Sequence, residues 1–252
     1  MQRMKEKYEG RSKHFLMGRN PVIIRIDGKS FHTYTRQLDK PFDDGLIEDM
    51  QITTRFLCQE IQGAKCGYTQ SDEISILITD YENFESQGWF NYNLQKMCSI
   101  AASLATAKFN QLRMIRYSNK HIHESLHSMN GSLQKNEIEK TTLAFFDARC
   151  FSIPKEEVNN YFYARQKDAV KNSIGMQAQA LYPHTELHGK NGNEQQELIF
   201  QKGINWNNLS CFKKRGTFVA KHTATVPGER SYWYIDENTP EFNTNKIIDT
   251  LI

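Results

Sequence analysis

The sequence predicts an α+β fold in which an antiparallel sheet carries helices on one face. Two short apolar runs, residues 22–24 and 74–78, are typical of buried strands. Two longer segments, about 43–62 and 91–112, repeat apolar residues at helical spacing. The elements therefore begin with a strand, a helix, two strands and a second helix, an order that suits a ferredoxin-like sheet.

The predicted elements of the first half have local signals at their ends. Residues 21–27 are expected to form a strand that ends at Asp27, followed by a loop over 28–42. Asp43 or Asp44 can accept a backbone N–H bond at the start of the helix over 43–62. Strands over 64–69 and 73–79 are expected to flank a tight turn at Asp72.

The second half continues with the same kinds of element. Pro154 is expected to start a helix, because proline is favoured at the first helical position and Glu156 and Glu157 suit the first turn. The remaining expectations are a helix or arm over 1–18, a polar irregular stretch over 115–140, a strand over 141–153, a helix over 154–182, a loop-rich segment over 183–215, and strands over 216–220 and 231–235.

Composition limits the class of protein. The formal net charge is only +3, which by itself does not indicate nucleic-acid binding. No apolar stretch approaches the ~20 residues that a membrane span needs, and the first ten residues lack the apolar core of a signal peptide. The five cysteines are widely spaced and form no Cys-x-x-Cys motif, so a reducing cytoplasm is the expected location.

Two short acidic motifs are the candidates for chemistry. Asp27-Gly28 follows the first predicted strand, and Ser71-Asp72-Glu73 stands at the turn between the next two. Carboxylates at the ends of neighbouring strands form an all-oxygen site that suits Mg²⁺ and the phosphates of a nucleotide. The pair therefore indicates phosphoryl or nucleotidyl transfer.

Each motif alone is also a common turn former, and Ser71 can simply donate a hydrogen bond within the turn. Glu73 is expected to point to the sheet face opposite Asp72, because side chains alternate along a strand. Strand patterns on both sides of both motifs favour a metal site.

The ordered motifs resemble the tRNA(His) guanylyltransferase family, and more closely its guanylyltransferase-like branch of 3′-to-5′ polymerases. The likeness covers about residues 5–220. The matching segments, in order, are 25–32, 40–43, 67–75, 96–103, 146–149, 165–166, 205–208 and 215–217. The resemblance implies a polymerase-palm-like fold and an enzyme that activates the 5′ end of a tRNA and then adds nucleotides to it.

The resemblance also assigns roles at the acidic motifs. Asp27 and Asp72 match the family's catalytic metal-binding carboxylates, Gly28 its backbone ligand, and Glu73 the neighbouring catalytic acid. Two Mg²⁺ ions are therefore expected, with ATP, GTP and other nucleoside triphosphates as substrates. The positions expected to handle the nucleotide and its triphosphate are Lys29, Ser30, Phe31, His32, Lys40, Asp43, Ser71 and Lys96.

Basic residues of the matching segments are expected to contact tRNA phosphates. They are Arg25, Arg149, Arg165, Lys167, Lys214 and Arg215. The resemblance further implies a homotetramer and a single catalytic unit over 1–252. Within it we expect a palm-like core over about 20–182 and an extension over about 183–252 that completes the tRNA and nucleotide site.

One departure from the family bears on the substrate. Members that add guanylate to tRNA(His) carry a His-Ile-Asn-Asn motif where this chain has Val170-Lys171-Asn172-Ser173. The missing histidine favours templated repair of 5′-truncated tRNA over guanylate addition to tRNA(His), which stays an alternative. Two further alternatives are a palm-fold nucleotide cyclase or diguanylate-type synthase, and a non-catalytic tRNA-binding module.

Overall fold

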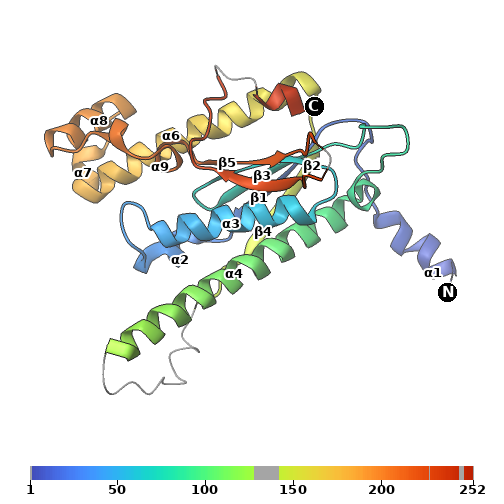
Figure 1. Ribbon diagram of the computed structural model, residues 1–252, viewed down its shortest axis with the longest axis horizontal. Helices are drawn as coiled ribbons and strands as arrows, with labels where there is room; N and C mark the ends of the chain where they lie inside the picture. Colours follow the sequence, from blue (N-terminus) through green and yellow to red (C-terminus); the bar gives the residue numbers. More distant parts are fainter. Residues whose placement is uncertain (1, 128–141, 227, 244–246, 252) are drawn as a thin grey trace.

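The computed structural model describes residues 2–127, 142–226, 228–243 and 247–251, with the helix but not the side chains over 120–127. Within these residues a six-stranded sheet forms the centre of the molecule (Figure 1). Its strand order is β4-β1-β3-β2-β5-β6, and all neighbouring strands are antiparallel. The strands are β1 (Val22–Gly28), β2 (Ala64–Gln70), β3 (Glu73–Ile78), β4 (Phe146–Ser152), β5 (Thr217–His222) and β6 (Tyr232–Asp236).

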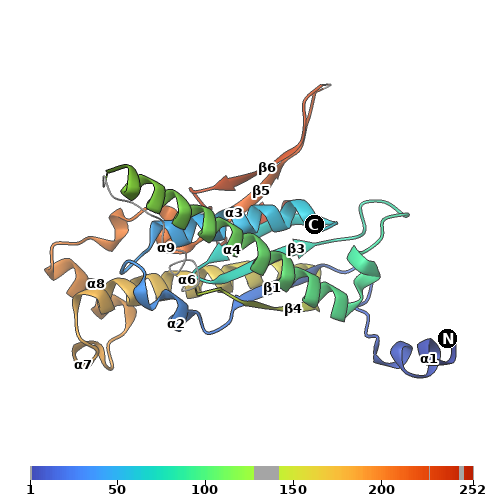
Figure 2. The same cartoon turned by 90° about the horizontal axis from the view of Figure 1, so that it is seen from below.

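The described helices differ greatly in length. They are α1 (Gln2–Lys7), α2 (Phe31–Tyr34), α3 (Asp44–Glu60), α4 (Leu94–His127), α6 (Val158–Leu181), α7 (His184–Leu187), α8 (Gly192–Gln201) and α9 (Cys211–Arg215). Short 3₁₀ turns lie at Glu9–Ser12, Thr35–Gln37, Trp89–Tyr92, Lys155–Glu157, Trp206–Asn208 and Ile247–Leu251. Figure 2 shows α1 apart from the sheet, and none of its residues is buried.

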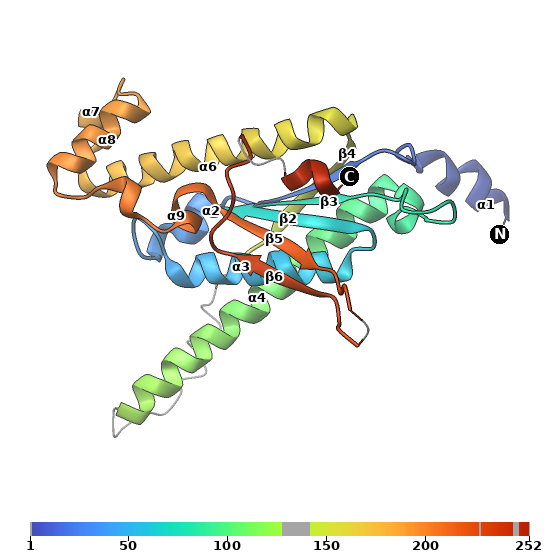
Figure 3. The ribbon, with the colours of Figure 1, turned by 45° about the horizontal axis from the view of Figure 1, so that its top comes forward.

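Helices cover both faces of the sheet, so the expectation of helices on one face is wrong. In Figure 3, α6 lies on one side of the sheet and α3 and α4 on the other. Ile24 packs in the core shared with α3 and α4, whereas its neighbour Ile23 packs with Phe162 of α6. The reason is visible in β1, where Val22, Ile23 and Ile24 are all buried, because a strand covered on both faces needs apolar side chains on both.

Apart from β4, the strands agree closely with the predicted ones, and the helices show two corrections. The stretch predicted as irregular from residue 115 is helical to His127, and the rest of that prediction, 128–140, lies outside the described residues. The segment predicted as loop-rich over 183–215 contains α7, α8 and α9. A reciprocal capping box between Asn191 and Glu194 starts α8. Strand β4 begins at Phe146, later than the predicted 141.

A buried ion-pair network joins α3 to α4. Asp49 is 1% exposed and accepts hydrogen bonds from Arg113 (3.1 Å) and from Arg116 (2.9 Å). Arg116 also pairs with Glu48, whose side chain is 58% exposed. One buried and one exposed carboxylate therefore share a guanidinium, which offers a matched comparison of their contributions to stability.

We expect Asp49→Ala to lower the free energy of unfolding by about 3 kcal/mol, because it leaves two arginines without their buried counter-charge. Glu48→Ala is the control and is expected to cost less than about 1 kcal/mol, because exposed ion pairs contribute little. Urea denaturation of both variants measures the difference. Equal losses would contradict the structural role given to Asp49.

Candidate functional site

Asp27 and Asp72 meet at one end of the sheet. Asp27 is the penultimate residue of β1, and Asp72 lies in the two-residue turn between β2 and β3. The backbone N–H of Gly28 donates to the carbonyl oxygen of Asp72 at 3.1 Å, which ties the end of β1 to that turn. The two motifs therefore lie on neighbouring strands, as predicted, and a backbone hydrogen bond joins them.

The turn that carries Asp72 is unusually tight. Ser71 adopts a left-handed conformation with φ 51°, which few residues other than glycine adopt. Its hydroxyl donates to Oδ1 of Asp72 at 2.9 Å. Ser71 therefore makes the hydrogen bond within the turn that is the ordinary role of a serine there. The same bond orients the neighbouring carboxylate.

The carboxylate pair has the electrostatics of a cation site. Burial raises the pKa of Asp72, and the charge of Asp27 raises it further, against the lowering effect of the Ser71 hydrogen bond. Two ionised carboxylates this close repel each other unless a cation lies between them. The donors are all oxygen, which is the ligand type that Mg²⁺ takes, so the residues present fit that ion.

Glu73 lies opposite Asp27 in the sheet but is bound by arginines. It pairs with Asp27 in the β1–β3 register, and only 5% of it is exposed. Its Oε2 accepts from Arg25 at 2.5 Å and from Arg165 of α6 at 3.5 Å. Burial raises the pKa of Glu73, and the two guanidiniums oppose that rise.

Arg149 is placed beside the pair by β4. Its Nη2 lies 4.0 Å from Oδ2 of Asp27 and 3.7 Å from Oδ1 of Asp147, and its side chain is 60% exposed. An exposed cation at the rim of an acidic site can contact a phosphate that approaches from solvent. Its position is compatible with the predicted contact to tRNA.

A small cavity of about 80 Å³ brings Asp43 and Ser71 together. Its walls are mainly apolar, and its polar members include Gln70 and Asn172. Asp43 also caps α3, where its Oδ1 accepts from the N–H of Leu46 at 2.6 Å, as predicted for this helix. An apolar slot with a few polar groups beside Asp72 suits a nucleobase.

The other residues expected to handle the nucleotide differ in their exposure to solvent. Lys29, Ser30 and His32 are exposed around the start of α2, next to Gly28, and Lys40 donates to the carbonyl of Thr35 at 3.0 Å. Phe31 differs from them. It is buried, with its ring among Tyr34, Phe109 and Phe146, so it packs in the core.

Lys96 lies far from the carboxylate pair within this chain. The Phe146 N–H, opposite Gly28, donates to Thr106 of α4 at 3.2 Å, so that part of α4 adjoins the site. Lys96 is ten residues earlier on the same helix, about 15 Å away at 1.5 Å per residue. The structure therefore does not bring Lys96 to the site.

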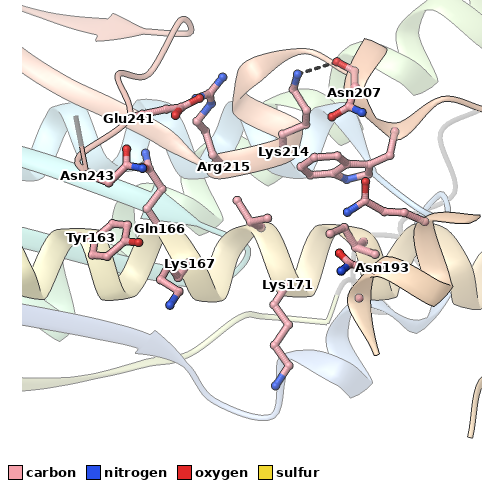
Figure 4. A pocket seen from close by; sticks show the side chains of 15 residues that line it. Tyr163, Gln166, Lys167, Lys171, Asn193, Asn207, Lys214, Arg215, Glu241 and Asn243 are labelled. Atoms are coloured by element: carbon pink, nitrogen blue, oxygen red, sulfur yellow. Dashed lines mark hydrogen bonds and ion pairs between the residues drawn. The ribbon is translucent and has the colours of Figure 1, made fainter. Parts of the chain in front are cut away.

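A basic cavity of about 490 Å³ lies between α6, α8 and α9 (Figure 4). Lys167, Lys214 and Arg215, three of the residues predicted to bind tRNA, line it together with Lys171. Lys214 donates to the carbonyl of Asn207 at 2.6 Å, and Arg215 pairs with Glu241. Trp206, also in the lining, lies under the ammonium group of Lys214.

A larger open groove of about 780 Å³ starts at Ser71 and runs along α6 to α7 and α8. Its cationic or ionisable members are Lys171, Lys190, His184 and His188, and none of the described lining residues is acidic. Sequence analysis did not select these four residues. His184, His188 and Lys190 lie on or beside two helices that were predicted as loop, and the only local signal there was the capping box of α8.

Carboxylates at the ends of adjacent antiparallel strands, with a basic groove that starts beside them, suit cation-assisted phosphoryl transfer. Comparisons with known proteins agree. Residues 1–154 match the family model described as Thg1, tRNAHis guanylyltransferase. The probable tRNA(His) guanylyltransferase of Drosophila melanogaster is 26% identical over 232 residues, which cover 83% of this chain and 70% of that protein.

Two solved structures resemble the whole chain. Both are bacterial tRNA(His) guanylyltransferase (Thg1)-like proteins. The one in complex with ATP is 42% identical, with a TM-score of 0.84, and the alignment covers 99% of this chain and 97% of that one. The one in complex with GTP is 40% identical, with a TM-score of 0.79 and the same coverage.

The fold and the site thus define a nucleotidyltransferase. The chain belongs to the tRNA(His) guanylyltransferase family, and its reaction is 3′-to-5′ nucleotide addition at the 5′ end of a tRNA. The predicted family, fold class and enzyme class are confirmed.

Gly28 has no room for a side chain. A Cβ there would lie 2.2 Å from Cδ2 of Phe31, whose ring is held in the aromatic core. We expect Gly28→Ala to lower the free energy of unfolding by about 1–3 kcal/mol. Gly175→Ala is the control, because its Cβ meets nothing closer than 3.9 Å and alanine favours a helix interior. A loss that is no greater for Gly28→Ala than for Gly175→Ala in thermal unfolding would refute the close approach.

The raised pKa of Asp72 predicts that its charge destabilises the metal-free protein. The folded state holds the proton more tightly than the unfolded state, so stability is lost as pH rises through the folded-state pKa. Without Mg²⁺, we expect Asp72→Asn to be more stable than the native protein at pH 7. The difference should shrink toward pH 4 in denaturant titrations, and a difference independent of pH would contradict it.

Proposed function

We propose that this enzyme repairs 5′-truncated tRNAs, adding nucleotides that are templated by the opposite strand after ATP activates the 5′ end. The observation that carries the proposal is the meeting of Asp27 and Asp72 at a turn whose Ser71 lines both a small, mainly apolar cavity and a groove with no acidic residue among its described lining. Val170 in place of the family's histidine supports repair over guanylate addition to tRNA(His). The bacterial relatives in complex with ATP and GTP support both nucleotides as substrates.

Asp27, Asp72 and the carbonyl of Gly28 would hold Mg²⁺. Bound there, the ion supplies neutralising charge for the entering and leaving oxygens of an in-line displacement at phosphorus. The hydrogen bond from Ser71 keeps the Asp72 carboxylate aimed, and the bond from Gly28 fixes the distance between the two motifs. Exposed Lys29 and Lys40 bind the non-bridging oxygens of the triphosphate as mobile point charges.

The RNA would lie along α6. The basic cavity and the groove are both lined by residues of this helix, and Lys171 and Gly192 line both. Cations of this kind bind phosphates without reading sequence, which suits an enzyme that accepts several tRNAs. Trp206 and Tyr163 add ring surfaces on which an unpaired base can stack.

The remaining organisation follows from the resemblance. We propose one catalytic unit over 1–252, with a core over about 20–182 and an extension over about 183–252 that completes the site. Consistent with this, β5 and β6 of the extension join the central sheet. The homotetramer and the cytoplasmic location stay predictions. None of the described helices is long and apolar enough to cross a membrane.

The direct test is extension of tRNAs that lack their first nucleotide, in ATP, GTP and Mg²⁺, against full-length tRNAs. We expect the added nucleotide to change when the opposite-strand nucleotide is changed. Asp27→Asn and Asp72→Asn should each slow addition about a thousandfold, equivalent to ~4 kcal/mol of lost transition-state stabilisation, while tRNA binding persists. Asp236→Asn, at the end of edge strand β6, is the control and should be near normal.

Other products would identify the alternatives. Guanylate added whatever the opposite nucleotide would indicate guanylate addition proper. Cyclic or dinucleotide product without RNA would indicate a cyclase or a diguanylate-type synthase. Binding of tRNA without any product would indicate a non-catalytic module.

A further inference from the structure

Two arginines from separate elements converge on one carboxylate oxygen beside the catalytic pair. Arg25 of β1 and Arg165 of α6 contact Oε2 of Glu73 at 2.5 and 3.5 Å. Arg165 also pairs with Asp168 at 2.8 Å, but the Asp168 side chain is 49% exposed and therefore screened by water. The buried part of the network is two guanidiniums around one carboxylate.

A second arginine is not needed to satisfy Glu73. One guanidinium can occupy both oxygens of a carboxylate in a bidentate pair, and two guanidiniums at one oxygen repel each other. The observed arrangement uses only Oε2 and leaves the buried Oε1 without a donor. Both arginines therefore bind the same oxygen of Glu73, and the network is not arranged to bury Glu73 at the lowest cost.

The network also leaves hydrogen-bond donors without acceptors. Each guanidinium has five N–H groups, and the buried Nε atoms of Arg25 and Arg165 have no acceptor among the described protein atoms. The side chains remain 26% and 22% exposed, so a ligand can reach their outer edges. Buried polar atoms without partners are uncommon in folded proteins and call for an explanation.

The arginines are on the face of the sheet that carries the chemistry. Arg25 stands two residues before Asp27 on β1, so both side chains point to the same side, toward α6. Glu73 is directly opposite Asp27 and follows Asp72. An oxyanion held by Arg25 and Arg165 would therefore sit next to the carboxylate pair.

We infer that Arg25 and Arg165 form a clamp for a terminal phosphate, and that Glu73 is a positioning residue that holds the clamp rather than a metal ligand. The inference rests on the proposed function, because it specifies how that site takes its phosphate. The ligand chemistry is a phosphate oxyanion, and it can come from the 5′-phosphate of the RNA or from a nucleoside triphosphate. The fork of an arginine matches either one.

The first experiment measures binding in Mg²⁺ without nucleoside triphosphate, so that no reaction occurs. The probes are a 5′-phosphorylated RNA hairpin, the same hairpin with a 5′-hydroxyl, and inorganic tripolyphosphate. The native protein should prefer the phosphorylated hairpin, and Arg165→Lys and Arg25→Lys should each reduce that preference about tenfold. A loss confined to tripolyphosphate would instead assign the clamp to the nucleotide.

The control is Arg116→Lys, which also removes a guanidinium from a buried carboxylate but lies on α4. It should leave both preferences unchanged. If the native protein binds phosphorylated and hydroxyl hairpins equally and does not bind tripolyphosphate, the clamp is wrong. The proposed function is judged separately by the extension assay, so the two failures are distinguishable.

The second experiment separates positioning from metal binding. Glu73→Gln keeps the shape but removes the charge that holds the arginines. It should weaken binding of the phosphorylated probe about as much as Arg165→Lys does, and leave the Mg²⁺ concentration for half-maximal extension unchanged. Asp72→Asn should raise that concentration. The inference would be overturned if Glu73→Gln raised the Mg²⁺ concentration for half-maximal extension as much as Asp72→Asn does and kept the preference for the phosphorylated hairpin. Thermal unfolding checks that Glu73→Gln folds, and the partly exposed Arg165→Lys tests the clamp if it does not.

Discussion

The register of β1 between β3 and β4 is the constraint on which the site depends. Antiparallel pairing sets Asp27 opposite both Glu73 and Asp147, and Arg25 opposite Ser75 and Arg149. Since side chains alternate along a strand, a slip of one residue would turn Asp27 toward the core of α3 and α4 and would carry Ile26 to the polar side. The apolar residues 22–24 prevent that slip, because on each face they fill a different core.

Because the sheet is covered by helices on both faces, one helix can contact both the catalytic residues and the proposed RNA surface. α3 and α4 hold one face through the Asp49 ion pairs, while α6 holds the other through Phe162 and through the contact of Arg165 with Glu73. The helix that adjoins the catalytic strands is also the helix along which both large cavities lie. A displacement of α6 would therefore change the phosphate contacts and the RNA surface together.

The carboxylate pair was accessible to prediction because each motif is local: an apolar run followed by an acidic turn. The partners of Glu73 were not, because Arg165 is 92 residues away and only the packing of α6 brings it close. The prediction of irregular structure from residue 115 was wrong for a physical reason. Residues 94–127 contain neither glycine nor proline, so a polar helix continues where apolar periodicity fades. Phe31 and Lys96 followed the family motif, which records order along the chain and not burial or distance.

The small core beyond the middle of α6 has a consequence for how such enzymes diverge. Ile174, Ala178, Leu187 and Ile199 form a cluster that shares no residue with the two cores of the sheet. Mutations in the core of α7 and α8 are therefore insulated from the strands that position Asp27 and Asp72. Selection can remodel this end of the molecule for a new set of RNAs while the catalytic strands stay as they are, so substrate range and reaction can evolve at different rates.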